Sequence, residues 1–174
     1  MLTVLLVVIV LLAALLGYAA TRPGTFHVQR TAIIQAPPEK IYPLIEDFHR
    51  WTEWSPYEKL DPAMKRTYTG AASGKGAVYT WDGNGKAGAG QMEITEAVPP
   101  SLVRIALDFT RPFRANNVTR FTLSPRDGGT EVVWAMDGTN AFITRVMGIF
   151  VNMDDLIGKD FVVGLANLKA VAER

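Results

Sequence analysis

The pattern that most constrains the fold is a strictly alternating segment in the middle of the chain. Apolar side chains occupy every second position from Val103 to Phe109, and Arg104, Ala106 and Asp108 lie between them. A period of two predicts a strand with one buried and one solvated face, as in an antiparallel sheet. The buried face of such a sheet must be covered by a second layer, which the rest of the chain has to supply.

Segments of the same kind lie on both sides of this one. Including it, strands are expected at residues 25–35, 64–70, 76–83, 89–98, 101–110, 116–125 and 130–138. The first alternates and is rich in β-branched residues, which favour strands. The sequence RDGG between the last two is typical of a hairpin turn. The chain therefore predicts an antiparallel sheet of about seven strands.

Two short helices are expected between the first two strands, and the first of them covers residues 37–48. Pro38 suits a first helical turn, and Leu44 and Ile45 belong to one apolar face. Pro43 is an objection, because an interior proline is expected to kink so short a helix.

The last part of the chain changes from the strand period to the helical period. From residue 153 onward the apolar positions form one stripe, which consists of Met153, Ile157, Phe161, Gly164, Leu165, Leu168 and Ala172. About 20 residues make a helix about 30 Å long, which is enough to cover one face of a sheet. Residues 141–152 predict a second, more apolar helical segment. The expected fold class is therefore α+β, with an antiparallel sheet, two short helices and a long C-terminal helix.

The first twenty residues differ from the rest, since residues 2–20 carry no charge and are almost all apolar. As a helix they would span about 28 Å, close to the hydrocarbon core of a bilayer. We interpret residues 1–21 as a single-pass transmembrane anchor and residues 25–174 as one domain. The alternative is a signal peptide cleaved near Ala19, which would leave the domain secreted or periplasmic.

The charges next to this segment predict on which side of the membrane the domain lies. Arg22 and Arg30 come after it, and no lysine or arginine precedes it. Because basic residues favour the cytoplasmic side, an anchored domain is expected in the cytoplasm. The sequence TRPGT, residues 21–25, predicts a hinge between the anchor and the domain.

Composition argues against several classes of function. The formal net charge is +1, so no basic footprint for nucleic acid is evident. The chain has no cysteine, and its two histidines, His27 and His49, are far apart in sequence, so neither a metal site nor a catalytic cysteine is expected. The sequence GNGKAG, residues 83–88, precedes a strand and not a helix, which indicates a hairpin and not a dinucleotide site. We therefore expect no catalytic residue, no cofactor, no metal and no nucleic-acid partner.

Three segments together resemble a known superfamily. They are APPEKIYPLIEDFHRWTEWSP at residues 36–56, TEVVWAMDG at 130–138 and GKDFVVGLANLKAVAE at 158–173. Over residues 25–172 the chain resembles START-like, or SRPBCC, proteins, in the branch called polyketide cyclase/dehydrase and lipid transport. The resemblance implies a helix-grip fold, in which a curved antiparallel sheet grips the long C-terminal helix around a hydrophobic cavity. It also implies a second short helix, which closes one end of that cavity together with the first.

This second short helix would contain two of the four tryptophans of the chain. Trp51 and Trp54 lie one helical turn apart and so face the same way, and Pro56 is expected to end the helix. One interpretation is that both indoles pack the short helices against the sheet. The other is that one of them lines the mouth of the cavity.

Strand alternation predicts which side chains face the helix and so form the ligand site. The large inward residues towards the open end are expected to touch a ligand, and these are Trp81, Phe109, Phe121, Trp134 and Met136. Tyr79 and Asn117 add polar contacts, and Trp51, Trp54 and Phe161 complete the predicted set. A one-residue bulge would turn such residues to the other face.

Three functions remain open from the sequence. The first is a membrane-tethered, non-catalytic protein that binds a lipid, a quinone or a polyketide-like molecule. The second is a protein-interaction module related to co-chaperone and stress-associated domains, which predicts an exposed apolar patch. The third is a cyclase or dehydratase, which needs an acid or base in the cavity. The predicted inward residues include no His, Asp, Glu or Lys.

Overall fold

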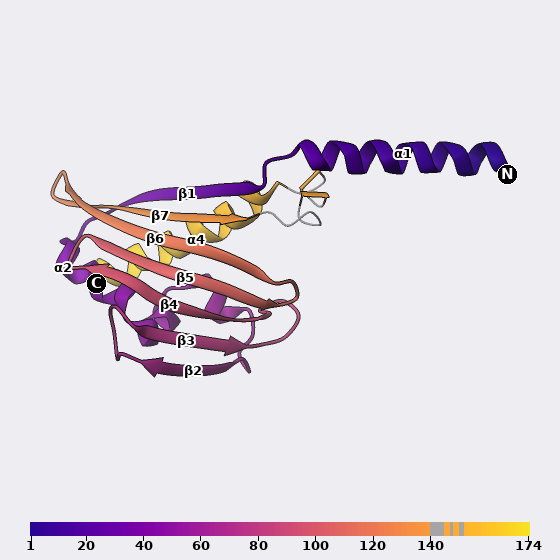
Figure 1. Cartoon of the computed structure of the whole chain (residues 1–174). Helices are drawn as coiled ribbons and strands as arrows, with labels where there is room; N and C mark the ends of the chain where they lie inside the picture. Colours follow the sequence, from indigo (N-terminus) through magenta and orange to yellow (C-terminus); the bar gives the residue numbers. More distant parts are fainter. Residues whose placement is uncertain (140–144, 147, 150–151) are drawn as a thin grey trace.

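Seven antiparallel strands form one curved sheet in the computed structural model, which describes residues 1–139, 145–146, 148–149 and 152–174. The strands are β1 (Thr25–Ile34), β2 (Lys65–Gly70), β3 (Ala77–Asp82), β4 (Ala89–Val98), β5 (Leu102–Arg111), β6 (Ala115–Arg126) and β7 (Gly129–Thr139). From β2 to β7 each strand pairs with the next, and β1 pairs with β7, so the first and last strands are neighbours (Figure 1). All the expected strands are confirmed, and each boundary lies within one residue of the expected one.

Hydrogen-bonded register places the alternating residues as expected. Phe121 of β6 lies opposite Trp134 of β7 and Val103 of β5, and all three are buried. The pairing of β4 with β5 shifts between Ile94 and Glu96, which is an irregularity of the β-bulge kind. A second shift lies between Ala89 and Gly90. Met92 and Ile94, between the two shifts, are buried, so the predicted inner face of β4 is preserved.

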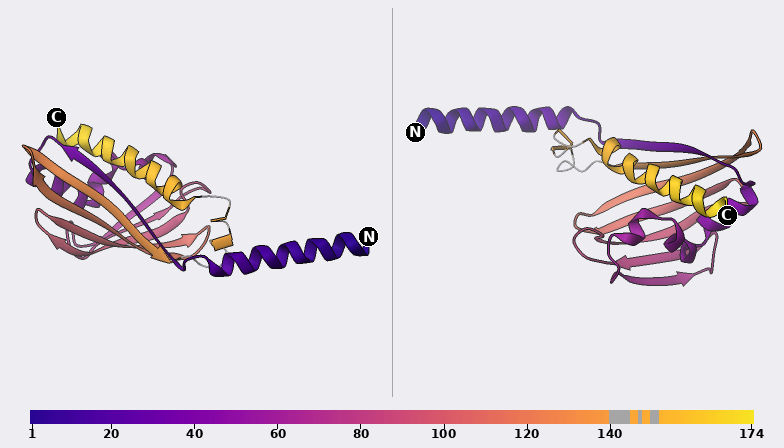
Figure 2. Two further views of the ribbon diagram at one scale, coloured as in Figure 1. Left: turned by 90° about the horizontal axis from the view of Figure 1, so that it is seen from above. Right: turned by 180° about the vertical axis from the view of Figure 1, so that it is seen from behind.

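The long helix α4 (Met153–Ala172) lies across one face of the sheet, which curves around it (Figure 2). The side chain of Asn152 caps the helix by accepting a hydrogen bond from the backbone N–H of Asp154. Asp154 and Asp155 in the first turn suit the positive end of the helix dipole. Five residues of the expected stripe form its buried face, and these are Phe161, Gly164, Leu165, Leu168 and Ala172.

Part of the predicted helical structure cannot be compared. The segment expected over residues 141–152 lies largely outside the described residues, and so does the side chain of Met153.

The short helices follow β1 as expected, with one correction. Helix α2 (Pro38–Glu46) forms as expected and contains Pro43 in its interior. The tryptophan stretch forms a 3₁₀ helix, η1 (Phe48–Glu53), with Trp54 just after its last residue. Pro56 is not the stop that the sequence suggests. It begins a further 3₁₀ turn, η2 (Pro56–Lys59), because the fixed φ of proline suits a first helical position.

Helix α1 (Leu2–Thr21) projects from the end of the domain at which β1 begins (Figures 1 and 2). Its side chains are almost all apolar, and Ala19 is the one buried residue of the helix. By length and composition it can cross a membrane, and an anchor and a signal sequence both have this character.

Candidate functional site

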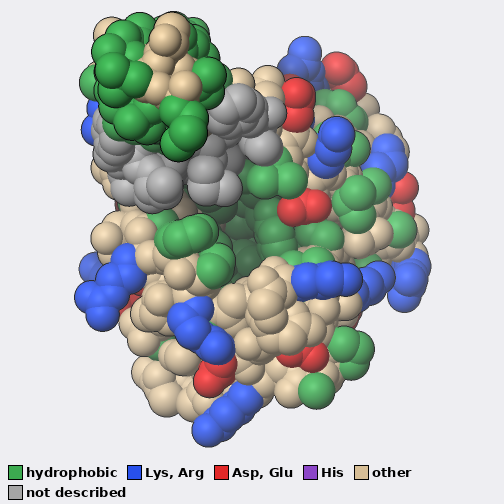
Figure 3. All heavy atoms as spheres, turned by 90° about the vertical axis from the view of Figure 1, so that its right-hand side faces the viewer, with side chains coloured by type: hydrophobic (Ala, Val, Ile, Leu, Met, Phe, Trp, Pro, Cys, Tyr) green, Lys and Arg blue, Asp and Glu red, His purple; other side chains and the backbone are tan. Residues whose placement is uncertain are grey.

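The end of the domain from which α1 projects is hollowed (Figure 3). Hydrophobic side chains gather inside the hollow, while basic and acidic side chains stand on the surface around it. This is the end at which β1 begins, β7 ends and β5 turns into β6. An apolar hollow with charged side chains on the surrounding surface suits a molecule that is itself mostly apolar.

Three strands place residues in one row of the inner face near this end. Phe26 of β1 lies opposite Gly138 of β7, which in turn lies opposite Asn117 of β6. The bare Gly138 allows the other two to close over it, because a Cβ atom there would collide with the Phe26 ring and with Asn117 Oδ1. Phe26, Gly138 and Asn117 together therefore form one wall of the hollow.

Asn117 is the unsatisfied polar group of this wall. Its side chain is 8% exposed, and its Oδ1 accepts no hydrogen bond from the described part of the chain. A buried acceptor without a partner costs about 1–3 kcal/mol. The amide oxygen lies against Gly138, so a donor in the hollow satisfies it only once the side chain turns away from that glycine.

An aromatic pair meets across β4, which lies between β3 and β5. Trp81 of β3 and Phe109 of β5 meet edge to face, with ring centroids 5.5 Å apart. The indole lies over Gly90 of β4, where a Cβ atom would collide with it, and Trp81 Nε1 donates a 3.0 Å hydrogen bond to the carbonyl of Ala87. Phe109 is only partly buried, so its ring offers apolar surface that the core leaves uncovered.

Deeper along the strands, four of the predicted site residues form a closed aromatic cluster. Trp134 stacks on Phe161 with centroids 4.0 Å apart, lies 4.9 Å from Phe121 and meets Trp54 edge to face at 5.6 Å. None of the four is more than 1% exposed. Met136 lies between this cluster and the row of Asn117 and is 7% exposed. The structure thus brings the predicted residues together as a packed floor beneath an apolar opening.

The indole N–H of Trp134 finds a partner that the sequence analysis missed. It donates a 2.9 Å hydrogen bond to Thr119 Oγ1, and that hydroxyl donates in turn to the carbonyl of Ala135 at 3.0 Å. Thr119 is 2% exposed and lies between Asn117 and Phe121 in the inward register of β6. The signal that would have revealed it is a threonine at an inward position of a strand.

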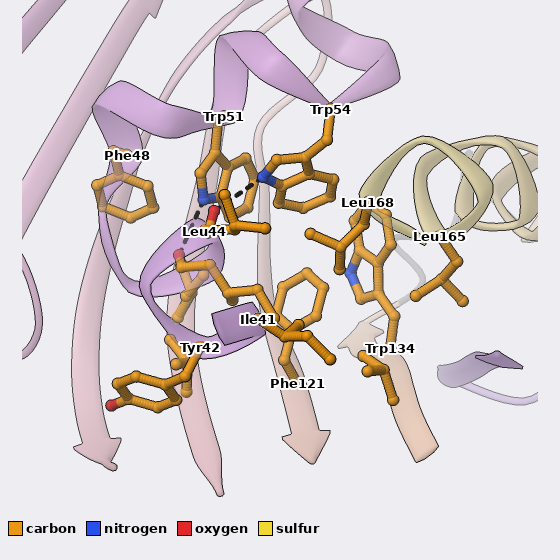
Figure 4. Close-up of a cluster of buried hydrophobic side chains, with 14 of the residues drawn as sticks. Ile41, Tyr42, Leu44, Phe48, Trp51, Trp54, Phe121, Trp134, Leu165 and Leu168 are labelled. Atoms are coloured by element: carbon orange, nitrogen blue, oxygen red, sulfur yellow. Dashed lines mark hydrogen bonds between the residues drawn. The ribbon is translucent and has the colours of Figure 1, made fainter. Parts of the chain in front are cut away.

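Trp51 and Trp54 hydrogen-bond to the helix that precedes them. Trp51 Nε1 donates to the carbonyl of Ile45 at 2.9 Å, and Trp54 Nε1 donates to the carbonyl of Leu44 at 2.8 Å (Figure 4). Both carbonyls belong to the last turn of α2, where a helix leaves its carbonyls unpaired. Trp51 and Trp54 are 4% and 0% exposed. Their indoles thus tie η1 to α2 and fill the space between α2 and the sheet.

We expect Trp54→Phe to lower the free energy of unfolding by about 1–3 kcal/mol, because the buried carbonyl of Leu44 loses its donor while most of the ring volume is kept. Denaturant unfolding of the full chain in detergent micelles measures this difference. A loss below about 0.5 kcal/mol would mean that water or another group replaces the indole.

A buried ionic cluster lies next to the pair of Trp81 and Phe109, because the ring of Tyr79 stacks on Trp81 with centroids 6.1 Å apart. Glu58 of η2 is 8% exposed, and its Oε1 accepts a 2.7 Å hydrogen bond from the hydroxyl of Tyr79. Its Oε2 accepts a 2.6 Å hydrogen bond from Arg66 Nε. Burial, with a smaller contribution from the bond to Glu58, raises the pKa of Tyr79 far above its usual range, so Tyr79 stays neutral. Both carboxylate oxygens are occupied, which suits a structural ion pair better than a free acid or base.

The side chains available for metal binding are few. In the described ranges no group of three or more His, Asp or Glu side chains is placed to hold a metal ion. The chemistry that this end offers is burial of an apolar molecule together with one hydrogen-bond acceptor.

Comparisons with known proteins agree with this architecture. Residues 25–173 match the family model described as polyketide cyclase/dehydrase and lipid transport. A search of curated proteins gave no match.

Three solved structures illustrate the similarity. A protein from Chromobacterium violaceum is 18% identical with a TM-score of 0.60, and the match covers 88% of this chain and 99% of that one. The Aha1 dimer from Colwellia psychrerythraea is 18% identical with a TM-score of 0.57, covering 85% and 96%. Major latex-like protein 151 from Panax ginseng is 13% identical with a TM-score of 0.59, covering 87% and 100%. At these identities the similarity establishes the fold.

Proposed function

Because the chain belongs to the polyketide cyclase/dehydrase and lipid transport family, we propose that its hydrophobic-ligand-binding domain carries a lipid, quinone or polyketide-like molecule beside a membrane. The family membership confirms the resemblance found in the sequence. The observation that carries the proposal is the apolar hollow at the end of the domain next to α1 (Figure 3). A water-filled apolar hollow gains free energy when an apolar molecule replaces the water.

Within this hollow the ligand contacts the less buried of the predicted site residues. Phe109 of this set is only partly buried, as is Phe26 of β1 in the row of Asn117, and Trp81 and Met136 are each 7% exposed. Trp134 is 1% exposed behind them and supports the floor of the site. The unpaired Oδ1 of Asn117 accepts a hydrogen bond from a hydroxyl or N–H group of the ligand and so orients it.

The membrane part of the proposal depends on α1. The helix is long enough to span a bilayer, and its apolar side chains lie exposed in the described structure, which suits contact with lipid. Arg22 follows it directly, and on this charge bias the domain lies on the cytoplasmic side.

Native mass spectrometry of the full chain released from detergent micelles tests the binding function. We expect a co-purified apolar compound at one copy per protein, and about tenfold or greater weakening of its binding by Phe109→Asp, because an unpaired carboxylate in an apolar hollow is costly. Val118→Asp is the matched control, since Val118 is 39% exposed on the opposite face of the sheet. Absence of any bound compound, or equal weakening by both substitutions, would contradict the proposal.

A specific observation also favours a second candidate, a protein-interaction module. Leu156, Val162 and Val163 on the outer side of α4 are 55%, 54% and 50% exposed. Such a patch fits contact with another protein, and the similar Aha1 structure is a dimer. If the native spectra show no small molecule but a stable protein complex that Val162→Asp abolishes, this second function replaces the first.

A further inference from the structure

The turn between β5 and β6 is an exposed tip that combines an aromatic ring with basic side chains. Phe113 is 59% exposed, and Arg111 and Arg114 on either side of it are exposed as well. Arg111 makes an ion pair with Asp82, whereas Arg114 has no ion-pair partner among the residues that the structure describes. Aromatic and basic side chains together suit the headgroup region of a bilayer.

This turn lies next to the point where α1 joins the domain. Only β7 separates β6 from β1, so the turn is about 10–15 Å from β1 across the sheet, at about 4.8 Å per strand. Along the strands, Phe26 and Asn117 share one row. Thr21, the last residue of α1, comes five positions before Phe26, and Phe113 comes four positions before Asn117. The end of α1 and the β5–β6 turn are therefore level with each other, as Figure 1 shows.

Side chains at the end of α1 mark where the membrane surface would lie. Tyr18 is 53% exposed, and the guanidinium of Arg22 lies 5.8 Å from the centre of its ring. A tyrosine and an arginine at the end of an apolar helix suit the interface between hydrocarbon and water. Residues 22–24 then reach at most about 10 Å before β1 begins, so the domain stays close to that surface.

We propose that the β5–β6 turn docks onto anionic lipid headgroups of the membrane that holds α1. Phe113 enters the headgroup layer, and Arg114 pairs with lipid phosphates. Docking turns the hollow toward the bilayer, because Phe109 and Asn117 lie on the two strands that this turn connects. An apolar ligand can then pass between bilayer and hollow without crossing water. This inference rests on the membrane anchoring in the proposed function.

The absence of cysteine from the chain makes a direct test feasible. A nitroxide spin label is attached to Phe113→Cys in the full chain, reconstituted in nanodiscs that contain anionic lipid. Ser124→Cys is the matched control, since Ser124 is an exposed residue at the opposite end of β6. We expect the label at position 113 to be severalfold less accessible to a water-soluble relaxing agent, and more accessible to oxygen, than the label at position 124.

Charge substitutions then test the lipid chemistry. Arg114→Glu, in the labelled Phe113→Cys chain, is expected to lower the ratio of docked to undocked protein about fivefold or more. Arg126→Glu changes the net charge equally at the far turn and should leave this ratio unchanged. If the protein stays in the nanodisc while position 113 is as water-exposed as position 124, docking is refuted and the anchor stands. If the protein does not stay in the nanodisc, the anchor itself is refuted, and docking with it.

Discussion

Replacing Phe161 by alanine is expected to lower the free energy of unfolding by about 3–5 kcal/mol, as for other buried phenylalanines. The ring is 0% exposed and stacks on Trp134 with centroids 4.0 Å apart, in the middle of the contact between α4 and the sheet. Gly164, one turn later, holds the helix so close that a Cβ atom there would lie 2.6 Å from Trp134 Cζ3. Neighbouring side chains that are this tightly placed have little freedom to fill the cavity left by the missing ring.

The adjacent residue provides the control. Val162 is 54% exposed, so Val162→Ala should change the stability by no more than about 0.5 kcal/mol. Denaturant unfolding of both full-length variants in detergent micelles, followed by far-ultraviolet circular dichroism, measures the difference. If the two substitutions had equal effects, α4 would not be clamped by the sheet in the way described.

Alternation and helical period predicted the fold because both follow directly from which side of an element is buried. The Val103–Phe109 alternation and the Phe161–Leu168 stripe each specify one buried face. A single sheet and a single long helix can cover those faces in only one way, namely by packing on each other. The strand boundaries were confirmed for the same reason, since turn residues separate every alternating segment.

The same patterns left the roles of the inward residues open. Trp51 and Trp54 were expected to face the same way, and they do, but the sequence did not reveal that their indoles bind the last carbonyls of α2. That pairing depends on how α2 and η1 approach each other. Trp134 and Phe109 both belong to the inward set, yet one is 1% exposed and the other only partly buried. Strand period predicts the face of a side chain but not its depth along the strand.

Glu58 shows most clearly what the strand and helix periods do not predict. It lies in a short polar segment, PYEK, which shows neither the alternation of a strand nor the repeat of an amphipathic helix. Nothing in the sequence therefore indicated that its carboxylate is buried. Its partners Arg66 and Tyr79 come from two later strands and meet it only after the sheet has formed. The inward residues of the strands include no acidic side chain. Glu58, a buried acid, comes from η2, outside the sheet.

The second large loss of stability is therefore expected when Arg66 is replaced. Arg66→Met should lower the free energy of unfolding by about 3 kcal/mol at neutral pH, because it leaves the carboxylate of Glu58 buried without its cation. The arginine also donates to the carbonyl of Glu58 at 3.1 Å and to that of Met64 at 2.9 Å, and both bonds are lost with it. Its side chain is 22% exposed, so water relieves part of the cost.

A second substitution separates charge burial from lost packing. Adding Glu58→Gln to Arg66→Met should restore part of the lost stability, because a neutral amide oxygen still accepts the hydrogen bond from Tyr79 while no unpaired charge remains. Arg104→Met is the control for an exposed pair: Arg104 and Glu96 are 44% and 47% exposed, and this change should cost no more than about 0.5 kcal/mol. Denaturant unfolding of the three variants and the parent chain gives the comparison. If Glu58→Gln made the Arg66→Met protein still less stable, the carboxylate would have to be stabilised by other groups, and the cluster would not be the ion pair that holds η2 against the sheet.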